Sequence, residues 1–459
     1  MRRSIFKVVL LTVLVVSLAL QLCGCGGSSA TKPDASGKSE GSTTTSSKPS
    51  SSEKIQIKMW TFLNPESNDG RGKALKKMIE NYQTKYPNVT VTVEPQQWQT
   101  MTAKFVASAE AGNAPDIGWC IHYEGATVIA QNLYVPFEDL FLNEWSEEDK
   151  ADIDDVFWRM SPDGKHYCVY LNRNLYGIIY RKDLFEAAGI EPKFNNWDEL
   201  VVAAQKLTKK DPKTGLDVWG LGSAYAVDGA ETAYMMPALM SREGGMVAAD
   251  GKANWADQDL ADALKFQIDM IDKYKITPST ALVTDFDGLV ADFCSGKYAM
   301  ACLGAVRIPS IKSQCTFDPN TVDIIPYPDI YGKTSLTDSS GWLIGVWSGS
   351  SHKQEAGRFV EEMMSKEGDE LWAKLGGQAP IRKSTFETMK SFFAQPGNQY
   401  FYNMADILDN HSRAYPPAVK ISAYKGDLNK AMQLAYVDKM DPLKALQQVS
   451  AEFNARNAN

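Results

Sequence analysis

The chain of 459 residues has few of the side chains that bind metals tightly. It contains four histidines and seven cysteines, and no two cysteines have the C-x-x-C spacing of structural zinc sites. Asp285 and Asp287 precede Gly288 but lack the rest of a calcium-binding loop. The sequence therefore predicts no metal site and no cofactor. Five cysteines of the folded part are predicted to be mostly buried free thiols: Cys120, Cys168, Cys294, Cys302 and Cys315.

The chain also lacks an excess of positive charge. Its 48 lysines and arginines stand against 56 aspartates and glutamates, which gives a formal net charge of −8. Nucleic acids are bound mainly through clustered lysines and arginines, so this composition excludes a general nucleic-acid binder. With 44% hydrophobic and 23% charged residues, the chain is typical of a protein that folds in water. Its length alone predicts two or three compact units.

Catalytic motifs are missing as well. The sequence has no G-x-S-x-G, no H-E-x-x-H, no G-x-x-x-x-G-K-[ST] and no complete G-x-G-x-x-G. Acid pairs such as Glu147 with Glu148 would serve a glycosidase only at a defined separation, which a sequence does not contain. We therefore predict that the protein is not an enzyme, with a secreted lipoprotein glycosidase as the alternative.

The N-terminus has the layout of a secretory signal. Arg2, Arg3 and Lys7 precede the apolar residues 8–20, a run shorter than the roughly 20 residues that cross a bilayer as a helix. The following Leu-Cys-Gly-Cys resembles a bacterial lipobox and places the acylated cysteine at Cys25, with Cys23 as the poorer choice. We predict a lipoprotein signal peptide over residues 1–24. An ordinary signal peptide is the alternative.

A tether is predicted over residues 25–54, because almost all of them are Gly, Ser, Thr, Lys, Pro, Asp or Glu. Lipid, tether and folded body together resemble the lipoproteins of Gram-positive bacteria. The predicted location is therefore the extracellular face of the cell membrane, with attachment through the N-terminal lipid.

The body begins with alternating strand and helix patterns. Residues 55–60 and 89–93 alternate apolar and polar side chains, and helical spacing lies between them from Ala74 to Tyr82. A helix near 100–111 and the apolar residues 117–121 follow, which predicts a largely parallel α/β sheet. Capping-box spacing marks helix starts at Asn196 and Ser351. Asp116, in the turn before residues 117–121, is predicted to bond nearby backbone amides.

Several segments in order resemble the extracellular solute-binding proteins of ABC importers, in the carbohydrate-binding cluster that includes maltose-binding protein. The matching segments are 91–97, 112–116, 180–190, 197–200, 293–300, 341–345 and 355–360 leading to 376–380. The resemblance implies a type II periplasmic-binding-protein fold, in which two α/β lobes are joined by hinge crossings and enclose a ligand cleft. The first lobe would hold residues 55–172 and 341–380, and the second 175–338 and 381–459.

The resemblance also implies the function. The protein would be the substrate-binding subunit of an ABC importer, a monomer that captures a mono- or oligosaccharide and delivers it to a membrane permease. The same binding fold with a non-sugar solute, such as a polyamine or a glycerol phosphodiester, is a further alternative.

Sugar sites combine flat aromatic rings with side chains that hydrogen-bond hydroxyl groups. The loop positions of the family pattern therefore indicate the candidate contacts, with Trp342 as the best single aromatic candidate. The predicted ligand-binding residues are Trp60, Asn64, Glu66, Arg71, Gln97, Trp98, Trp119, Tyr123, Asn172, Asn174, Tyr176, Glu231, Thr232, Tyr234, Arg307 and Trp342.

Overall fold

The computed structural model contains two β-sheets within one compact unit, residues 51–459. The parts of the chain that the structure describes are residues 54–160, 163–171, 174–210, 215, 217–227, 233–248, 250–414 and 424–457. The predicted signal peptide, Cys25 and nearly all of the predicted tether lie outside these residues.

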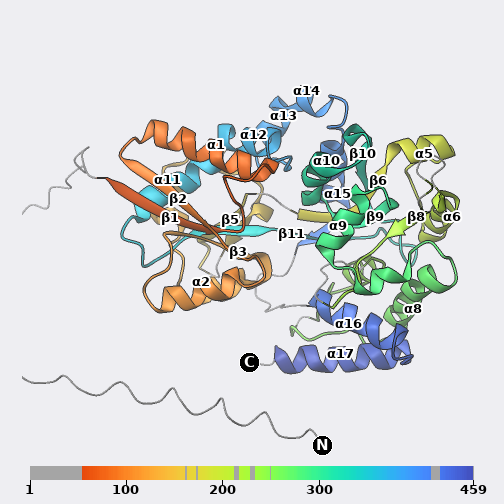
Figure 1. Ribbon diagram of the computed structural model, residues 1–459. Helices are drawn as coiled ribbons and strands as arrows, with labels where there is room; N and C mark the ends of the chain where they lie inside the picture. The colour runs from red at the N-terminus through yellow and green to blue at the C-terminus, as the bar shows by residue number, and fades with distance from the viewer. Residues whose placement is uncertain are drawn as a thin grey trace, which may run out of the picture. The chain divides into compact units, whose positions relative to one another are not determined.

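The first sheet has six strands in the order β2-β1-β3-β12-β5-β4 (Figure 1). In that order the strands are β2 (Val89–Pro95), β1 (Ile55–Thr61), β3 (Ile117–Ile121), β12 (Trp342–Val346), β5 (His166–Tyr170) and β4 (Trp158–Met160). Strand β1 is parallel to both β2 and β3, as the β-α-β pattern predicts. The other pairings, β12 with β3 and β5, and β4 with β5, are antiparallel.

Helices pack on both faces of the first sheet. Figure 1 shows α1 and α12 on one face and α2 on the other. The helices of this half are α1 (Gly70–Lys85), α2 (Met101–Glu110), α3 (Gly125–Ala130), α4 (Glu147–Ala151), α11 (Lys353–Met363) and α12 (Lys366–Lys374). Four short 3-10 helices join them: η1 (His122–Glu124), η2 (Phe137–Asp139), η3 (Leu142–Glu144) and η4 (Asp155–Phe157).

The second sheet has the order β13-β11-β6-β9-β8-β7, and β10 also pairs with β6. Its strands are β6 (Asn174–Arg181), β7 (Lys209–Lys210), β8 (Asp217–Gly222), β9 (Tyr298–Gly304), β10 (Val322–Ile325), β11 (Thr337–Ser340) and β13 (Ser412–Ala414). The α-helices around it are α5 (Lys182–Ala188), α6 (Trp197–Leu207), α7 (Met235–Met240), α8 (Gln258–Asp272), α9 (Phe286–Cys294), α10 (Ile308–Gln314), α13 (Lys383–Thr388), α14 (Lys390–Phe393), α15 (Tyr400–Asn410), α16 (Tyr424–Tyr436) and α17 (Pro442–Arg456). The 3-10 helices are η5 (Ser279–Val283), η6 (Ala305–Arg307) and η7 (Pro319–Thr321).

The second sheet is buried on both faces. Along β6, Leu175 and Ile179 pack into one hydrophobic cluster, while Tyr176 and Ile178 pack into another. Successive side chains of a strand point to opposite faces, so β6 separates two cores. The first sheet has a core of its own, which includes Trp119.

Two expectations from the sequence are wrong in detail. The sheets are only partly parallel, because β6 pairs antiparallel with β9, β10 and β11, and β12 joins the first sheet antiparallel. A strand that enters directly from another sheet has no crossover helix to impose a parallel direction. Ser351 does not cap a helix either, because α11 begins after His352 without a side-chain cap.

Two other local expectations are confirmed. The Asn196 side chain accepts a hydrogen bond from the backbone amide of Glu199 at 3.0 Å and so caps α6. Asp116 accepts hydrogen bonds from the backbone amide of Lys58 at 2.8 Å and from Ser350 Oγ at 2.6 Å. It therefore ties three segments of the first half together.

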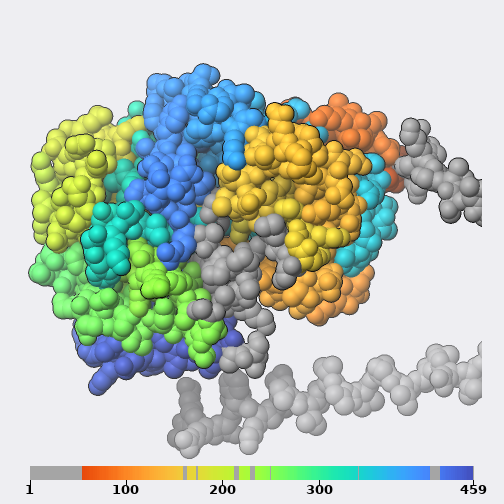
Figure 2. All heavy atoms as spheres, turned by 180° about the vertical axis from the view of Figure 1, so that it is seen from behind, coloured from red at the N-terminus to blue at the C-terminus, as the bar shows by residue number. Residues whose placement is uncertain are grey.

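The chain passes between the two sheets more than once. It leaves the first sheet after β5 and returns through Gly341, which separates β11 from β12. After α12 it passes again into the second half, where α13–α15 pack. Figure 2 shows this blue segment against the amber segment of the first half, and the Lys383 amide donates to the Asp152 carbonyl at 2.9 Å.

Candidate functional site

Three strand ends meet at one edge of the first sheet. The parallel strands β1 and β3 both end there, and the antiparallel strand β12 begins there, with Trp342 paired to Ile121. Ligand sites of α/β sheets lie beyond the carboxyl ends of parallel strands. This edge is therefore the candidate binding site.

An aromatic cluster occupies this edge, made of Phe62, Trp119 and Trp342. The Phe62 ring centroid lies 4.7 Å from that of Trp342 at an interplanar angle of 45°, and 5.8 Å from that of Trp119 at 85°. Trp119 is 1% exposed, whereas Trp342 is half-buried. A half-buried ring on buried rings presents a rigid apolar surface at low entropic cost.

The indole of Trp119 has an unused donor. Its Nε1 is buried and has no hydrogen-bond partner among the residues that the structure describes. A buried donor without a partner costs free energy, so such a group in a native protein calls for an explanation. A bound acceptor would supply one.

Arg71 lies beside the aromatic cluster, in the first turn of α1. Its guanidinium carbon is 5.3 Å from the centroid of the Phe62 ring. The carboxylate of Asp69 caps the helix and accepts from the backbone amides of Arg71 and Gly72 at 3.0 and 3.1 Å. Burial by itself raises the pKa of Asp69, but the hydrogen bonds from Ser67 and these amides outweigh it, and the pKa lies below its usual range. The Asp69 carboxylate is thus ionised, and it already accepts hydrogen bonds from the first amides of α1.

A second arginine approaches from the other half of the molecule. Burial of Arg71 and then repulsion from Arg307 lower the pKa of Arg71 to about 10. Arg307, in η6 after β9, bonds to Asp287 at 2.6 Å and lies 4.3 Å from the Phe286 ring centroid. The charge of Arg307, in one half of the molecule, therefore acts on the guanidinium of Arg71 in the other half.

Backbone packing explains this approach. A Cβ on Gly70, beside Arg71, would overlap the carbonyl oxygen of Leu375. A Cβ on Gly377, whose φ is +64°, would overlap the ring of Pro309. Because the segment after α12 contacts both helix starts, it brings the beginnings of α1 and α10 close together.

Comparison with known proteins decides the family. The family model of bacterial extracellular solute-binding proteins matches residues 77–397. The chain belongs to this family. The predicted solute-binding family is thereby confirmed, and its description places the protein outside the cytoplasm.

Individual relatives of this solute-binding protein agree. The lactose-binding protein of Rhizobium radiobacter is 25% identical over 376 residues, which cover 78% of this chain and 83% of the relative. The GacH receptor of Streptomyces glaucescens, solved unliganded and with acarbose, superimposes with a TM-score of 0.73 at 20% identity, over 88% of this chain and 99% of its own. UgpB of Mycobacterium tuberculosis, solved with glycerophosphocholine, has the same TM-score at 16% identity, over 87% and 98%. The predicted type II fold is confirmed.

Three of the predicted contacts of the solute-binding protein lie together, and a fourth acts on one of them through its charge. Trp119 and Trp342 belong to the aromatic cluster, Arg71 flanks it, and Arg307 interacts electrostatically with Arg71. Their positions in the sequence are far apart; Trp119, Trp342 and Arg71 lie at the edge of the first sheet, whereas Arg307 belongs to η6 of the other half.

Other predicted contacts in the first half already have partners. Trp60 donates from Nε1 to Glu94 at 2.8 Å, and the ammonium of Lys104 lies 4.6 Å from its ring. Asn64 accepts from the backbone amide of Glu66 within a turn, and Glu66 forms an ion pair with Lys76 at 2.9 Å. The remaining two lie in the segment between β2 and α2, where Gln97 is exposed and Trp98 half-buried.

In the second half, Asn174 and Tyr176 lie at the start of β6, next to the first crossing. Asn174 Oδ1 accepts from the amide of Val306 at 3.4 Å. The Tyr176 ring is 3.6 Å from the ammonium of Lys425, which also lies 3.3 Å from Asp338. Both residues therefore face structural partners of the second half.

Tyr234 lies apart from the aromatic cluster. Its ring packs against Trp197 and Phe266 at centroid distances of 4.7 and 4.5 Å, and burial raises its pKa to about 12. Asn172, Glu231 and Thr232 lie outside the described residues, as does the side chain of Tyr123, whose backbone belongs to η1.

Two residues near the strand ends were not among the predicted contacts. Phe62 is the central ring of the aromatic cluster, and its position directly after β1 is the signal that would have indicated it. Glu124 is half-buried at the end of η1, and burial raises its pKa despite a hydrogen bond with Thr102. A carboxyl donates a hydrogen bond when it is protonated and accepts one when it is ionised.

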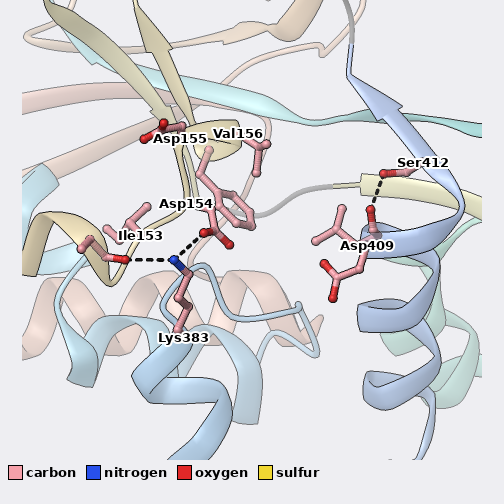
Figure 3. Close-up of a pocket in the computed structure, with 10 residues that line it drawn as sticks. Ile153, Asp154, Asp155, Val156, Lys383, Asp409 and Ser412 are labelled. Atoms are coloured by element: carbon pink, nitrogen blue, oxygen red, sulfur yellow. Dashed lines mark hydrogen bonds and ion pairs between the residues drawn. The ribbon is translucent and has the colours of Figure 1, made fainter.

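A separate cavity of about 650 Å³ lies between the two halves, where α4, η4 and the residues between them face α13, α15 and β13 (Figure 3). Lys383 reaches into it, bonding to Asp154 at 2.5 Å and to the Ala151 carbonyl at 3.0 Å, while Asp409 points in from the opposite wall. None of the predicted ligand contacts lines this cavity.

Within the described parts of the chain, no group of three or more His, Cys, Asp or Glu side chains is placed to hold a metal ion. Among the helices that the structure describes, none has the length and apolar character needed to cross a bilayer.

Proposed function

We propose that this solute-binding protein is the lipid-anchored, sugar-binding subunit of an ABC importer. It captures a mono- or oligosaccharide between its two lobes without chemical change and delivers it to a membrane permease. The observation that carries this proposal is the aromatic cluster, whose half-buried Trp342 directly follows the crossing at Gly341. A ring at a crossing would contact the solute and respond when the lobes close.

The relatives support a sugar as the solute, because one is a lactose-binding protein and another was solved with acarbose. Calorimetry against a panel that includes lactose and malto-oligosaccharides tests the proposal. We expect at least one sugar to bind and to be recovered unchanged after long incubation. Hydrolysis of that sugar would favour the glycosidase alternative, and tight binding of a polyamine instead would replace the sugar.

We further propose that residues 1–24 are removed and that Cys25 is acylated, with residues 25–54 as the tether. Two acyl chains hold a protein on a membrane stably, whereas one does so only marginally. Mass spectrometry after expression in a lipidating host tests this. Cys25→Ser should release the protein into the medium and Cys23→Ser should not; the reverse pattern would move the anchor to Cys23.

The lobe boundaries complete the proposal. Residues 55–172 with 341–380 would form one lobe, and 175–338 with 381–459 the other. Small-angle scattering with and without sugar should show a monomer that becomes more compact when sugar binds. An unchanged radius of gyration at saturation would contradict hinge closure.

A further inference from the structure

The free polar groups beside the aromatic cluster are donors. The buried Trp119 Nε1 can only donate, and it has no partner among the described residues. The Arg71 guanidinium likewise can only donate. Among the contacts of the described residues it packs on Phe62 and makes no hydrogen bond or ion pair.

The carboxylates around Arg71 are occupied by other groups. Asp69 caps α1 and also accepts from Ser67 Oγ. Glu66 is paired with Lys76 and Asp287 with Arg307. Glu94, on the neighbouring strand, accepts from Trp60 at 2.8 Å. None of these carboxylates forms an ion pair or a hydrogen bond with the Arg71 guanidinium within the described chain, although the charges of Asp69 and Asp287 partly offset the lowering of its pKa.

Positive charge also comes from the other half of the molecule. The segment after α12 contacts the starts of both α1 and α10, which brings Arg307 toward Arg71. Repulsion between the two groups lowers the pKa of Arg71, in addition to the effect of burial. Two cations that approach each other in a desolvated place are stabilised by an anion bound between them.

We propose that the solute bound at the aromatic cluster carries an oxyanion, a carboxylate or a phosphate ester, which Arg71 contacts while Arg307, itself paired with Asp287, adds a partly compensated positive charge. This inference rests on the proposed function, because it names the class of sugar that the same site takes. A neutral hydroxyl group both donates and accepts, and neither Arg71 nor Trp119 Nε1 can accept its proton. An oxyanion only accepts, and it matches Arg71 and Trp119 Nε1 together.

The test compares ligands that differ only in charge. Calorimetry would pair galacturonate with galactose, digalacturonate with a neutral galactose disaccharide, and glucose 6-phosphate with glucose, each at low and high salt. We expect the charged member of at least one pair to bind about tenfold more tightly, the gain expected of a charge-assisted hydrogen bond. The gain should shrink as salt rises. The pair that shows it distinguishes a carboxylate from a phosphate.

Variants locate the effect. Arg71→Gln should abolish the preference for the charged ligand, and Arg71→Lys should keep part of it because a lysine retains the charge but not the planar fork. Arg307→Gln should reduce the preference. Arg358→Gln is the matched control, because Arg358 lies on α11 beside Glu355 and away from the aromatic cluster. Thermal unfolding of each variant checks that it folds.

The outcomes separate the two proposals. Neutral sugars that bind as tightly as their charged partners would overturn the oxyanion but leave sugar binding intact. A preference for charge that survives Arg71→Gln would also overturn this inference. If no sugar of either kind binds, sugar binding and the oxyanion both fail.

Discussion

Phe62 and Trp342 are in direct ring contact, with centroids 4.7 Å apart, although one follows β1 and the other begins β12. The contact joins the end of the first strand to the residue that directly follows the crossing from the second sheet. It makes Trp342 both part of the first core and a neighbour of the crossing. Ligand binding at Trp342 would therefore depend both on the packing of the first core and on the position of the crossing.

Trp342→Ala should weaken sugar binding by about 1–3 kcal/mol, as is usual for an aromatic anchor. Calorimetry with the best sugar of the panel measures this, and Trp342→Phe should retain part of the affinity. Trp347→Ala, just beyond the other end of β12, is the matched control, since Trp347 also packs on the first core. An unchanged affinity in Trp342→Ala would remove this ring from the site.

Asp152→Asn should lower the free energy of unfolding by about 1–3 kcal/mol at neutral pH, the cost of weakening buried hydrogen bonds to a charged group. The Asp152 carboxylate accepts from the Ser384 amide at 2.7 Å, from Ser384 Oγ at 2.6 Å and from the nearly buried Arg382 at 3.0 Å. Burial alone raises the pKa of Asp152, but these hydrogen bonds and the Arg382 charge lower it below its usual value. Urea unfolding measures the loss.

The pH dependence of the Asp152 effect has a definite sign. A carboxyl whose pKa is lowered by folding contributes stability above its ordinary pKa of 3.8 and loses it as the pH falls through the lower folded value. The difference between wild type and Asp152→Asn should therefore shrink in strong acid. Asp154→Asn is the control, because its ion pair with Lys383 is half-exposed and should matter little.

Asp369 should produce the opposite pH dependence. It is buried and accepts from the amides of Ile381 and Arg382 at 3.0 and 3.1 Å, yet burial raises its pKa to about 6. The folded state therefore holds its proton more tightly than the unfolded state, so its contribution to stability is complete below pH 3.8 and is lost as the pH rises through 6. Two pKa units correspond to about 3 kcal/mol.

Asp369→Asn should remove this slope between pH 4 and pH 7, whatever its effect on stability at one pH. Urea unfolding at several pH values measures the slope. Glu370→Gln, on the same helix and paired with Lys374 in solvent, should keep the slope of the wild type. An identical slope in wild type and Asp369→Asn would show that Asp369 is ionised throughout.

The cysteines of the second half should react slowly with an aromatic disulfide reagent at pH 8. Burial raises the pKa of Cys294 to about 11 and also raises the pKa of the half-buried Cys315, so little of either thiol is ionised. Cys315 should react first, because it is the more exposed. Single Cys→Ala variants identify the reacting thiol, and rapid labelling of Cys294 in the folded protein would contradict its burial.

Much of the local structure was predictable because neighbouring residues decide it. Asn196 caps α6 through an amide only three residues away, and the pattern of residues 89–93 becomes β2 as an edge strand. The wrong prediction at Ser351 also concerns neighbouring residues. The spacing of a capping box was present, but the neighbouring Ser350 donates to Asp116 and accepts from the amide of His352. Ser350 thus forms one tertiary and one local hydrogen bond, and α11 begins without a side-chain cap.

The sequence by itself determined the α/β elements, the net charge of −8 and, through the order of its segments, the solute-binding family. Those properties follow from periodicity, composition and local turns. Only the tertiary structure decided that Phe62 joins Trp119 with Trp342, and that Arg71 packs on Phe62 where the charge of Arg307 acts on it. These relationships arise where the two sheets and the segment after α12 pack together. The sequence does not contain them, because they depend on which side chains lie close together in the folded chain.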